Sequence, residues 1–222
     1  MKRLQPLPLL TIAFFILTAG SCFAHTINYS MEIKPIDTVI GFYTWLGFLH
    51  IIPHGLDHIL FVLSLFLLDS RLKPVILQAS CFTVAHTVTL ILSSKGIIEP
   101  PEKAIEIIIS ASIVFVALEN IFIGTLKPWR YFIIFVFGLI HGMGFATALN
   151  ETGLPRNAFY TSLISFNVGV ELGQIAVIMI AYFLVGKWFS HEVWYKKRIV
   201  YPASALIALI ACYWTFERIF TA

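Results

Sequence analysis

The chain has 222 residues, of which 59% are hydrophobic and 12% are charged, and its mean hydropathy is +0.87. Soluble domains carry roughly 25% charged residues, so this composition excludes an ordinary soluble protein and indicates an integral membrane protein. The net charge of +3 does not indicate nucleic-acid binding, because the Lys and Arg residues lie in short connectors between apolar runs, where they act as topological anchors.

The first 24 residues have the pattern of a secretory signal peptide. Lys2 and Arg3 form a basic start, an apolar stretch follows over 9–19, and a small-x-small cleavage site lies at 22–24. Cleavage there would make His25 the mature N-terminus, where it would either capture a metal or be an ordinary mobile residue. Retention of the segment as an uncleaved anchor is the alternative.

Residues 25–222 are expected to form a single transmembrane domain of six helices. Each apolar segment is close to the length of about 20 residues that a bilayer core requires. The predicted spans are 45–68, 74–94, 103–124, 129–149, 157–186 and 199–219. The first apolar run is too long for one upright helix and is interrupted by Pro53 and Gly55, so a short interfacial or re-entrant helix is predicted near 38–51. The expected fold class is an all-α membrane protein, a six-helix bundle after a signal peptide.

Basic residues are concentrated in alternate connectors. The connectors at 69–73, 125–130 and 187–198 hold eight Lys and Arg residues, whereas the opposite connectors hold three. The positive-inside rule places the basic connectors in the cytoplasm, in agreement with an exported N-terminus. We therefore predict a multi-pass protein of the bacterial inner membrane whose mature N-terminus is periplasmic or extracellular.

Two short motifs of the first half recur in the second half. Gly-Leu-Asp-His at 55–58 is similar to Gly-Leu-Ile-His at 138–141, and Phe-Thr-Val-Ala at 82–85 is similar to Phe-Asn-Val-Gly at 166–169. Three spans separate the copies, so the second copy would cross the membrane in the opposite sense. A 3+3 inverted repeat with a polar site at its interface is typical of secondary transporters. Chance similarity between short apolar segments is the alternative.

Ionisable residues lie in the middle of these apolar segments. Such residues are costly in hydrocarbon, so they face the bundle interior and mark an ion or substrate pathway. With a rise of about 1.5 Å per residue, their depths overlap in the outer half of the bilayer, which would allow a common site open to the exterior. The candidate metal ligands are His50, Asp57, His58, His86, His141 and Glu171.

Each candidate also has a structural interpretation. Asp57 is either an oxygen ligand, a partner that fixes a histidine tautomer, or a helix cap. His86 is either a ligand or a packing residue, and Glu171 is a ligand, a proton acceptor, or a neutral acid bonded to Asn167. Glu119 would form an inner exit for an ion or pair with the basic residues of the 125–130 connector.

Further polar residues are expected beside the ligands or along the pathway: His54, Thr83, Asn167, Gln174 and Glu119. His50, His54 and His58 are spaced four residues apart, so they would share one helix face only if the helix continued through Pro53. Asn167 and Gln174 lie with Glu171 on one polar stripe of the fifth span.

Histidine and carboxylate ligands without thiolates favour a borderline divalent ion such as Ni²⁺, Co²⁺, Zn²⁺ or Cu²⁺. The chain has no phosphate-binding loop, so direct ATP coupling is not expected. The predicted partners are the metal ion and the lipid bilayer, without nucleic acid, and the oligomeric state is not predicted.

Between residues 41 and 181 the sequence resembles the HupE/UreJ family. The resemblance rests on five ordered motifs, which are Gly47-Phe48-Leu49-His50-Ile51 with Gly55-Leu56-Asp57-His58-Ile59-Leu60-Phe61, the segment Phe82 to Leu90, Glu119-Asn120, the segment Gly138 to Ala146, and the segment Phe166 to Gln174. It implies about six spans after a cleavable signal and a secondary permease for nickel or cobalt, associated with hydrogenase and urease maturation. The resemblance supports His50, Asp57, His58, His86, His141, Asn167 and Glu171 as site residues. His54 lies outside the family pattern, and His50-Ile51 replaces the His-Pro form of the hydrogenase-linked members.

Three functions follow from these features. The leading one is a secondary permease for a divalent transition metal, with an intramembrane His/Asp/Glu site open to the exterior. The alternative is an intramembrane metal-dependent hydrolase with a His-ligated metal and Glu171 as general base. The third is a metal-sensing or metallochaperone-like subunit that binds without transport.

Overall fold

A computed structural model of the chain describes residues 31–220. The predicted signal peptide and His25 lie outside the described residues. The long helices are α2 (Ile36–Ile51), α3 (Leu56–Leu68), α4 (Leu72–Ser94), α5 (Glu102–Phe122), α6 (Trp129–Thr152), α7 (Phe159–Ala181) and α9 (Tyr201–Phe220). Short helical segments lie at Arg156–Ala158, Tyr182–Gly186, α8 (Lys187–Phe189) and Lys196–Val200.

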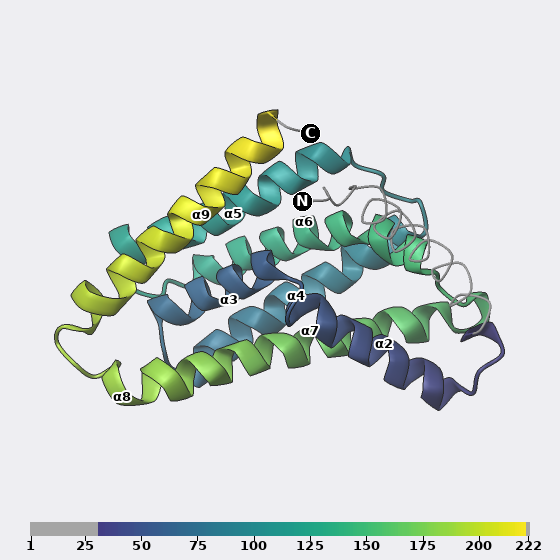
Figure 1. Ribbon diagram of the computed structural model, residues 1–222, viewed down its shortest axis with the longest axis horizontal. Helices are drawn as coiled ribbons and strands as arrows, with labels where there is room; N and C mark the ends of the chain where they lie inside the picture. Colours follow the sequence, from purple (N-terminus) through teal and green to yellow (C-terminus); the bar gives the residue numbers. More distant parts are fainter. Residues whose placement is uncertain (1–30, 221–222) are drawn as a thin grey trace, which may run out of the picture.

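Length and hydropathy make this chain a multi-pass membrane protein. Five helices of the described part are long and apolar enough to cross a membrane, and the bent pair α2 and α3 would make a sixth span. The predicted all-α fold with about six spans is therefore confirmed. Figure 1 shows that α2 and α3 occupy opposite halves of the bundle, while α4 and α7 run along most of its length.

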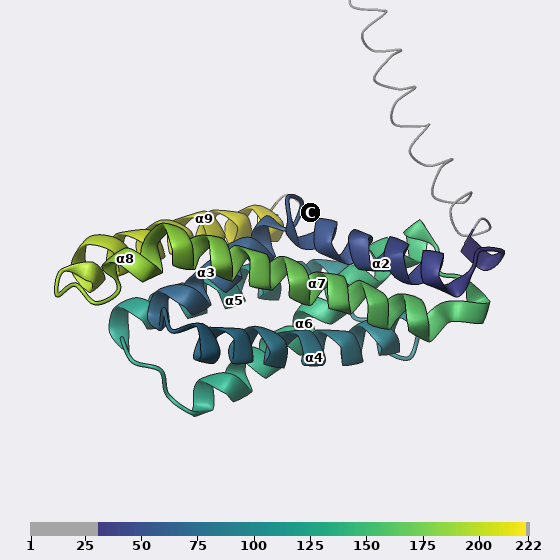
Figure 2. The same cartoon turned by 90° about the horizontal axis from the view of Figure 1, so that it is seen from below.

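The helices pack in well-defined pairs. In the view of Figure 2, α4 and α6 lie together in one layer, and α7 lies above them with α2 on its flank. The other large contact joins α5 to α9, at one side of the bundle. The buried core is mostly apolar, with Phe66, Phe82 and Phe166 among its largest side chains, but it also contains buried polar and charged residues, among them Glu119 and Arg130.

The first predicted span is not one continuous helix. A break at 52–55 separates α2 from α3, and the two helix axes differ by 71°. Pro53 supplies no backbone N–H at this point, and a Cβ at Gly55 would lie 2.2 Å from the carbonyl oxygen of His50, so only glycine fits the turn. His50 and His58 therefore stand on different helices and do not form a single ladder with His54.

The segment expected near 38–51 is helical, but α2 begins at Ile36 and packs along the first half of α7. Gly47 meets the carbonyl oxygen of Phe166 so closely that a Cβ would lie only 1.9 Å from it. Small residues of this kind allow two membrane helices to approach closely. The interfacial role expected for this segment stays a prediction.

The packing relates the two halves of the chain in a register that differs from the predicted one. Phe82 and Phe166 were matched in the two copies, and Gly138 of α6 meets the Phe82 carbonyl oxygen as Gly47 of α2 meets that of Phe166. One turn further along, Gly142 of α6 contacts Thr89 of α4, and at the equivalent place Ile51 of α2 contacts Gly173 of α7. The Gly-x-x-His motif at 138–141 therefore corresponds in packing to Gly-x-x-His at 47–50, and not to the motif at 55–58.

Candidate metal centre

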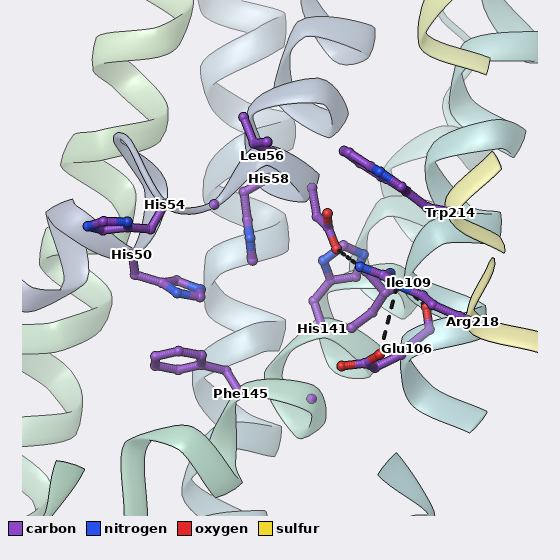
Figure 3. Close-up of a pocket in the computed structure, with 13 residues that line it drawn as sticks. His50, His54, Leu56, His58, Glu106, Ile109, His141, Phe145, Trp214 and Arg218 are labelled. Carbon is purple, nitrogen blue, oxygen red and sulfur yellow. Dashed lines mark hydrogen bonds and ion pairs between the residues drawn. The ribbon is translucent and has the colours of Figure 1, made fainter. Parts of the chain in front are cut away.

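Three histidines from three helices converge at the break between α2 and α3. His50 lies at the end of α2, His58 in the first turn of α3 and His86 in the middle of α4. One ring nitrogen from each lies within 4.8 Å of the others. The ring centroids are 4.7 Å apart for His50 and His58, and 6.0 Å apart for His58 and His86. Figure 3 shows the His50 and His58 rings directed toward the same space.

Each of the three histidines has a ring nitrogen without a partner among the described residues. The Nε2 atoms of His50, His58 and His86 are buried without a hydrogen bond. A buried polar atom without a partner is costly, and buried polar groups are usually satisfied by protein, water or a ligand. Three histidines that converge and each carry such a nitrogen therefore form a candidate site for a cation.

A hydrogen bond to Asn167 fixes the tautomer of His86. Its Nδ1 lies 2.9 Å from Oδ1 of Asn167, and Nδ2 of Asn167 donates to the carbonyl oxygen of Leu163 at 2.8 Å. Because the Asn167 amide donates to Leu163, its oxygen accepts from His86, so Nδ1 of His86 carries the proton. Nε2 is then left with a free lone pair, which is the form of imidazole that binds a metal.

His141 lies beside the three histidines. Its ring centroid is 5.3 Å from that of His58, and its Nε2 lies 3.0 Å from Oγ of Ser112. Ser112 donates its hydroxyl proton to the carbonyl oxygen of Ile109, so it accepts from Nε2 of His141. The buried Nδ1 of His141 is again left without a partner. Like His86, His141 thus has one ring nitrogen that is hydrogen-bonded and one that has no partner, although it is not part of the 4.8 Å group.

Aromatic side chains enclose the histidines. The Phe145 ring lies 3.9 Å from the His50 ring, measured between centroids, and stacks on Phe166. Phe82 packs against both His58 and His141. These walls lower the local dielectric, so a cation bound there would interact strongly with its ligands.

A cavity of about 380 Å³ reaches this centre from the end of the bundle where α5 begins and α9 ends. It is lined by His50, His58 and His141, and by charged residues from three helices. Asp57 lies among them and pairs with Arg218, at 2.8 Å between Oδ2 and Nη2. Asp57 therefore directly precedes His58 in the sequence, but its carboxylate pairs with Arg218. His54 also lines the cavity, and its residue is exposed.

Glu171 lies in a different cavity, of about 260 Å³, between α4 and α7. No lining residue is common to the two cavities. The hydroxyl of Ser80 donates to Oε1 of Glu171 at 2.5 Å. Thr83 and Gln174, which were expected along the pathway, bond to each other at 3.1 Å. The structure therefore does not bring Glu171 to the three histidines, although Asn167, one turn away, reaches His86.

Glu119 forms an ion pair with Arg130 in the bundle interior. The distance between Oε2 and Nη1 is 2.6 Å, and both side chains are almost fully buried, at 2% and 0% exposure. Nε of Arg130 also donates to Oε1 of Gln78 at 2.9 Å. This contact corresponds to the second interpretation of Glu119, in which it pairs with a basic residue of the 125–130 connector.

Three residues of this region were missed from the sequence: Ser112, Glu106 and Arg218. Ser112 gave no signal, because single serines are common in membrane helices. Glu106 and Arg218 lie near the ends of their spans, where charged residues are usually interfacial anchors. Arg218 had one distinguishing feature, its place on the outer side in the predicted topology, where the positive-inside rule expects few basic residues.

A comparison with protein families found one described as HupE / UreJ protein, whose model matches residues 26–218. No curated protein and no solved structure matches the chain.

Proposed function

The chain belongs to the HupE/UreJ family, and from this premise we propose that it is a secondary permease for a divalent transition metal ion. The family is linked to nickel and cobalt uptake, which agrees with a buried histidine group that could hold a metal. The observation that carries the proposal is the convergence of His50, His58 and His86, each with an unpartnered ring nitrogen, within a multi-pass membrane protein.

The donor set favours the kind of ion. Three neutral imidazoles, with a fourth nearby in His141, suit Ni²⁺, Co²⁺, Zn²⁺ or Cu²⁺, and the described residues place no thiolate in the group. A set of only three protein ligands leaves coordination positions for water. Such a site binds an ion without enclosing it completely, which suits a cargo that must also leave.

The packing of the two halves supports transport. α2 lies on α7 as α6 lies on α4, and the equivalent Gly-x-x-His motifs end at His50 and His141. A site at the interface of two such repeats is the arrangement that secondary transporters use for alternating access. We also propose that the protein lies in the bacterial inner membrane with its mature N-terminus outside, because the signal pattern and the distribution of basic residues both favour this orientation.

The hydrolase alternative has less support. A general base must lie within about 3 Å of the water that it activates, or act through one further water. Glu171 is bonded to Ser80 and lines a cavity that shares no residue with the one at the histidines.

The relay of an ion or proton through Asn167 and Glu171 stays a prediction. The contact of Asn167 with His86 supports its first step, from the histidines to Asn167.

Uptake into proteoliposomes tests this function. The purified protein should carry Co²⁺ or Ni²⁺ into vesicles that enclose a metal-sensitive dye, without ATP. We expect His58→Ala and His86→Ala each to lower the initial rate by more than about tenfold, because even a lost partner behind a ligand costs 10–100-fold in affinity.

His191→Ala is the matched control, because His191 is an exposed histidine of the 187–198 connector. Its uptake should equal that of the unchanged protein. A tightly retained single metal with no flux would reject the permease in favour of a binding or catalytic role.

A further inference from the structure

The cavity that leads to the histidines has a charged group at its other side. Arg218, near the end of α9, lies between two carboxylates from different helices. Its Nη2 is 2.8 Å from Oδ2 of Asp57 on α3, and its Nε is 3.8 Å from Oε2 of Glu106 on α5. Nη1 also donates to the backbone carbonyl oxygen of Glu106 at 2.9 Å. Figure 3 shows these ion pairs beside His141.

The charges of this group do not balance. One guanidinium faces two carboxylates, so these three side chains together carry an excess negative charge in the lining of the cavity. Such a geometry concentrates the field and raises the local concentration of cations. The excess charge also distinguishes the group from a simple structural ion pair.

The ion pairs are weak enough to be exchanged. The side chains of Asp57, Glu106 and Arg218 are 25%, 48% and 22% exposed. Ion pairs with this access to solvent stabilise a protein only weakly, because water screens them. A divalent ion brings twice the charge of the guanidinium to the same carboxylates, so it can compete for them.

A second observation in the same cavity points to a cation. Nε2 of His58 and Nδ1 of His141 have no partner, and these residues line the cavity at only 7% and 1% exposure. Asp57 and His58 point in different directions from α3, but both line this cavity, so an ion held at the carboxylate shares the cavity with the first imidazole. The oxygen and nitrogen donors therefore follow one another along one cavity.

From this arrangement we infer that Asp57 and Glu106 form an outer station for hydrated divalent cations, which Arg218 fills as a tethered cation until an arriving ion displaces it. The inference rests on the proposed function, because the station supplies the histidines. Carboxylate oxygens bind hydrated divalent ions with little discrimination, so the imidazoles make the selection among metals.

Cobalt binding to the full-length protein in lipid nanodiscs tests the station, with stopped-flow absorbance for the rates. Asp57→Asn and Glu106→Gln should each slow Co²⁺ association by about tenfold through the lost field, with an unchanged dissociation rate from the imidazoles. Arg218→Gln should reveal a second, weaker Co²⁺ per protein, which is lost again when Glu106→Gln is added.

Glu102→Gln is the matched control, because Glu102 is an exposed acid on the same helix that does not line the cavity. It should bind Co²⁺ at the rate of the unchanged protein. Glu106 is half exposed, so its substitution is compatible with folding even if that of Arg218 is not.

The outcomes separate the two proposals. If His58→Ala abolishes binding while Asp57→Asn and Glu106→Gln associate at the normal rate, the station is rejected and the permease is not. If the unchanged protein binds no Co²⁺ but Arg218→Gln binds one, the station stands and the proposed function fails. If neither protein binds Co²⁺, both proposals fail.

Discussion

Single hydrogen bonds decide which nitrogen of two of the imidazoles, those of His86 and His141, is available to an ion. Asn167 holds the proton of His86 on Nδ1, and Ser112 holds that of His141 on Nε2. The two histidines thus present different nitrogens, because their partners lie on opposite sides of the rings. Partners of this kind orient the ligand and raise its basicity, so they contribute to affinity without touching the metal.

Asn167→Leu should weaken metal binding by about 10–100-fold, because His86 would lose the acceptor that fixes its tautomer. The measurement is a competition titration of the purified protein with a coloured chelator. Gln174→Leu is the matched control, since Gln174 is a buried amide on the same helix that bonds to Thr83 and to no histidine. Equal affinities of the two variants would contradict the role of Asn167.

At the scale of the helices, backbone contact at glycine brings the site together. Gly47 and Gly138 let α2 and α6 rest on the backbones of α7 and α4, beside Phe166 and Phe82. The histidine of each motif follows its glycine by three residues, almost one turn. The close contact therefore also sets how far His50 and His141 lie from the axis of the bundle.

Gly47→Ala should destabilise the protein by about 1–3 kcal/mol, because the new methyl group would collide with the Phe166 backbone, which cannot move aside as a side chain can. Gly41→Ala, on the same helix, has no atom within 4 Å of the new Cβ and should be neutral or slightly stabilising. Thermal unfolding in detergent, followed by tryptophan fluorescence, compares them. A loss of the same size in both variants would rule out the contact as the cause.

The sequence predicted the helices well because apolar runs of about 20 residues are a strong signal. It also placed Asn167 beside the ligands or along the pathway, and in the structure Asn167 bonds to His86. It placed Glu171 in the same site. Glu171 follows Asn167 by four residues on α7, and four residues of a helix span about 6 Å, so Glu171 lies further from His86 than Asn167 does. The direction in which each side chain points around its helix was the second unknown, after the position along the helix.

Asp57 illustrates that second unknown. Consecutive residues of a helix point about 100° apart, so Asp57 and His58 cannot both face the same centre. His58 turns toward His50, and Asp57 turns toward Arg218 of the last helix. Contacts between the first and last spans depend on tertiary packing, which no local pattern in the sequence encodes.

For the whole molecule, the distribution of basic residues predicts which end faces the cytoplasm. Glu99→Cys, in the α4–α5 connector, should react with a membrane-impermeant thiol reagent added to intact cells. Ser190→Cys, in the 187–198 connector, should react only after the membrane is opened. Both variants require Cys22, Cys81 and Cys212 replaced by serine, and the parent without cysteine is the control. The reverse labelling pattern would overturn the proposed orientation.

The ion pair of Arg130 and Glu119 bears on the energy supply of a cell. It lies near the end of α5 and the start of α6, and neither residue lines the cavity at the histidines. Each elementary charge that crosses a membrane dissipates about 2.3 kcal/mol per 100 mV of potential. Because these side chains have almost no contact with solvent, they offer ions no aqueous path at that end, so we expect the resting protein not to dissipate the membrane potential of its host.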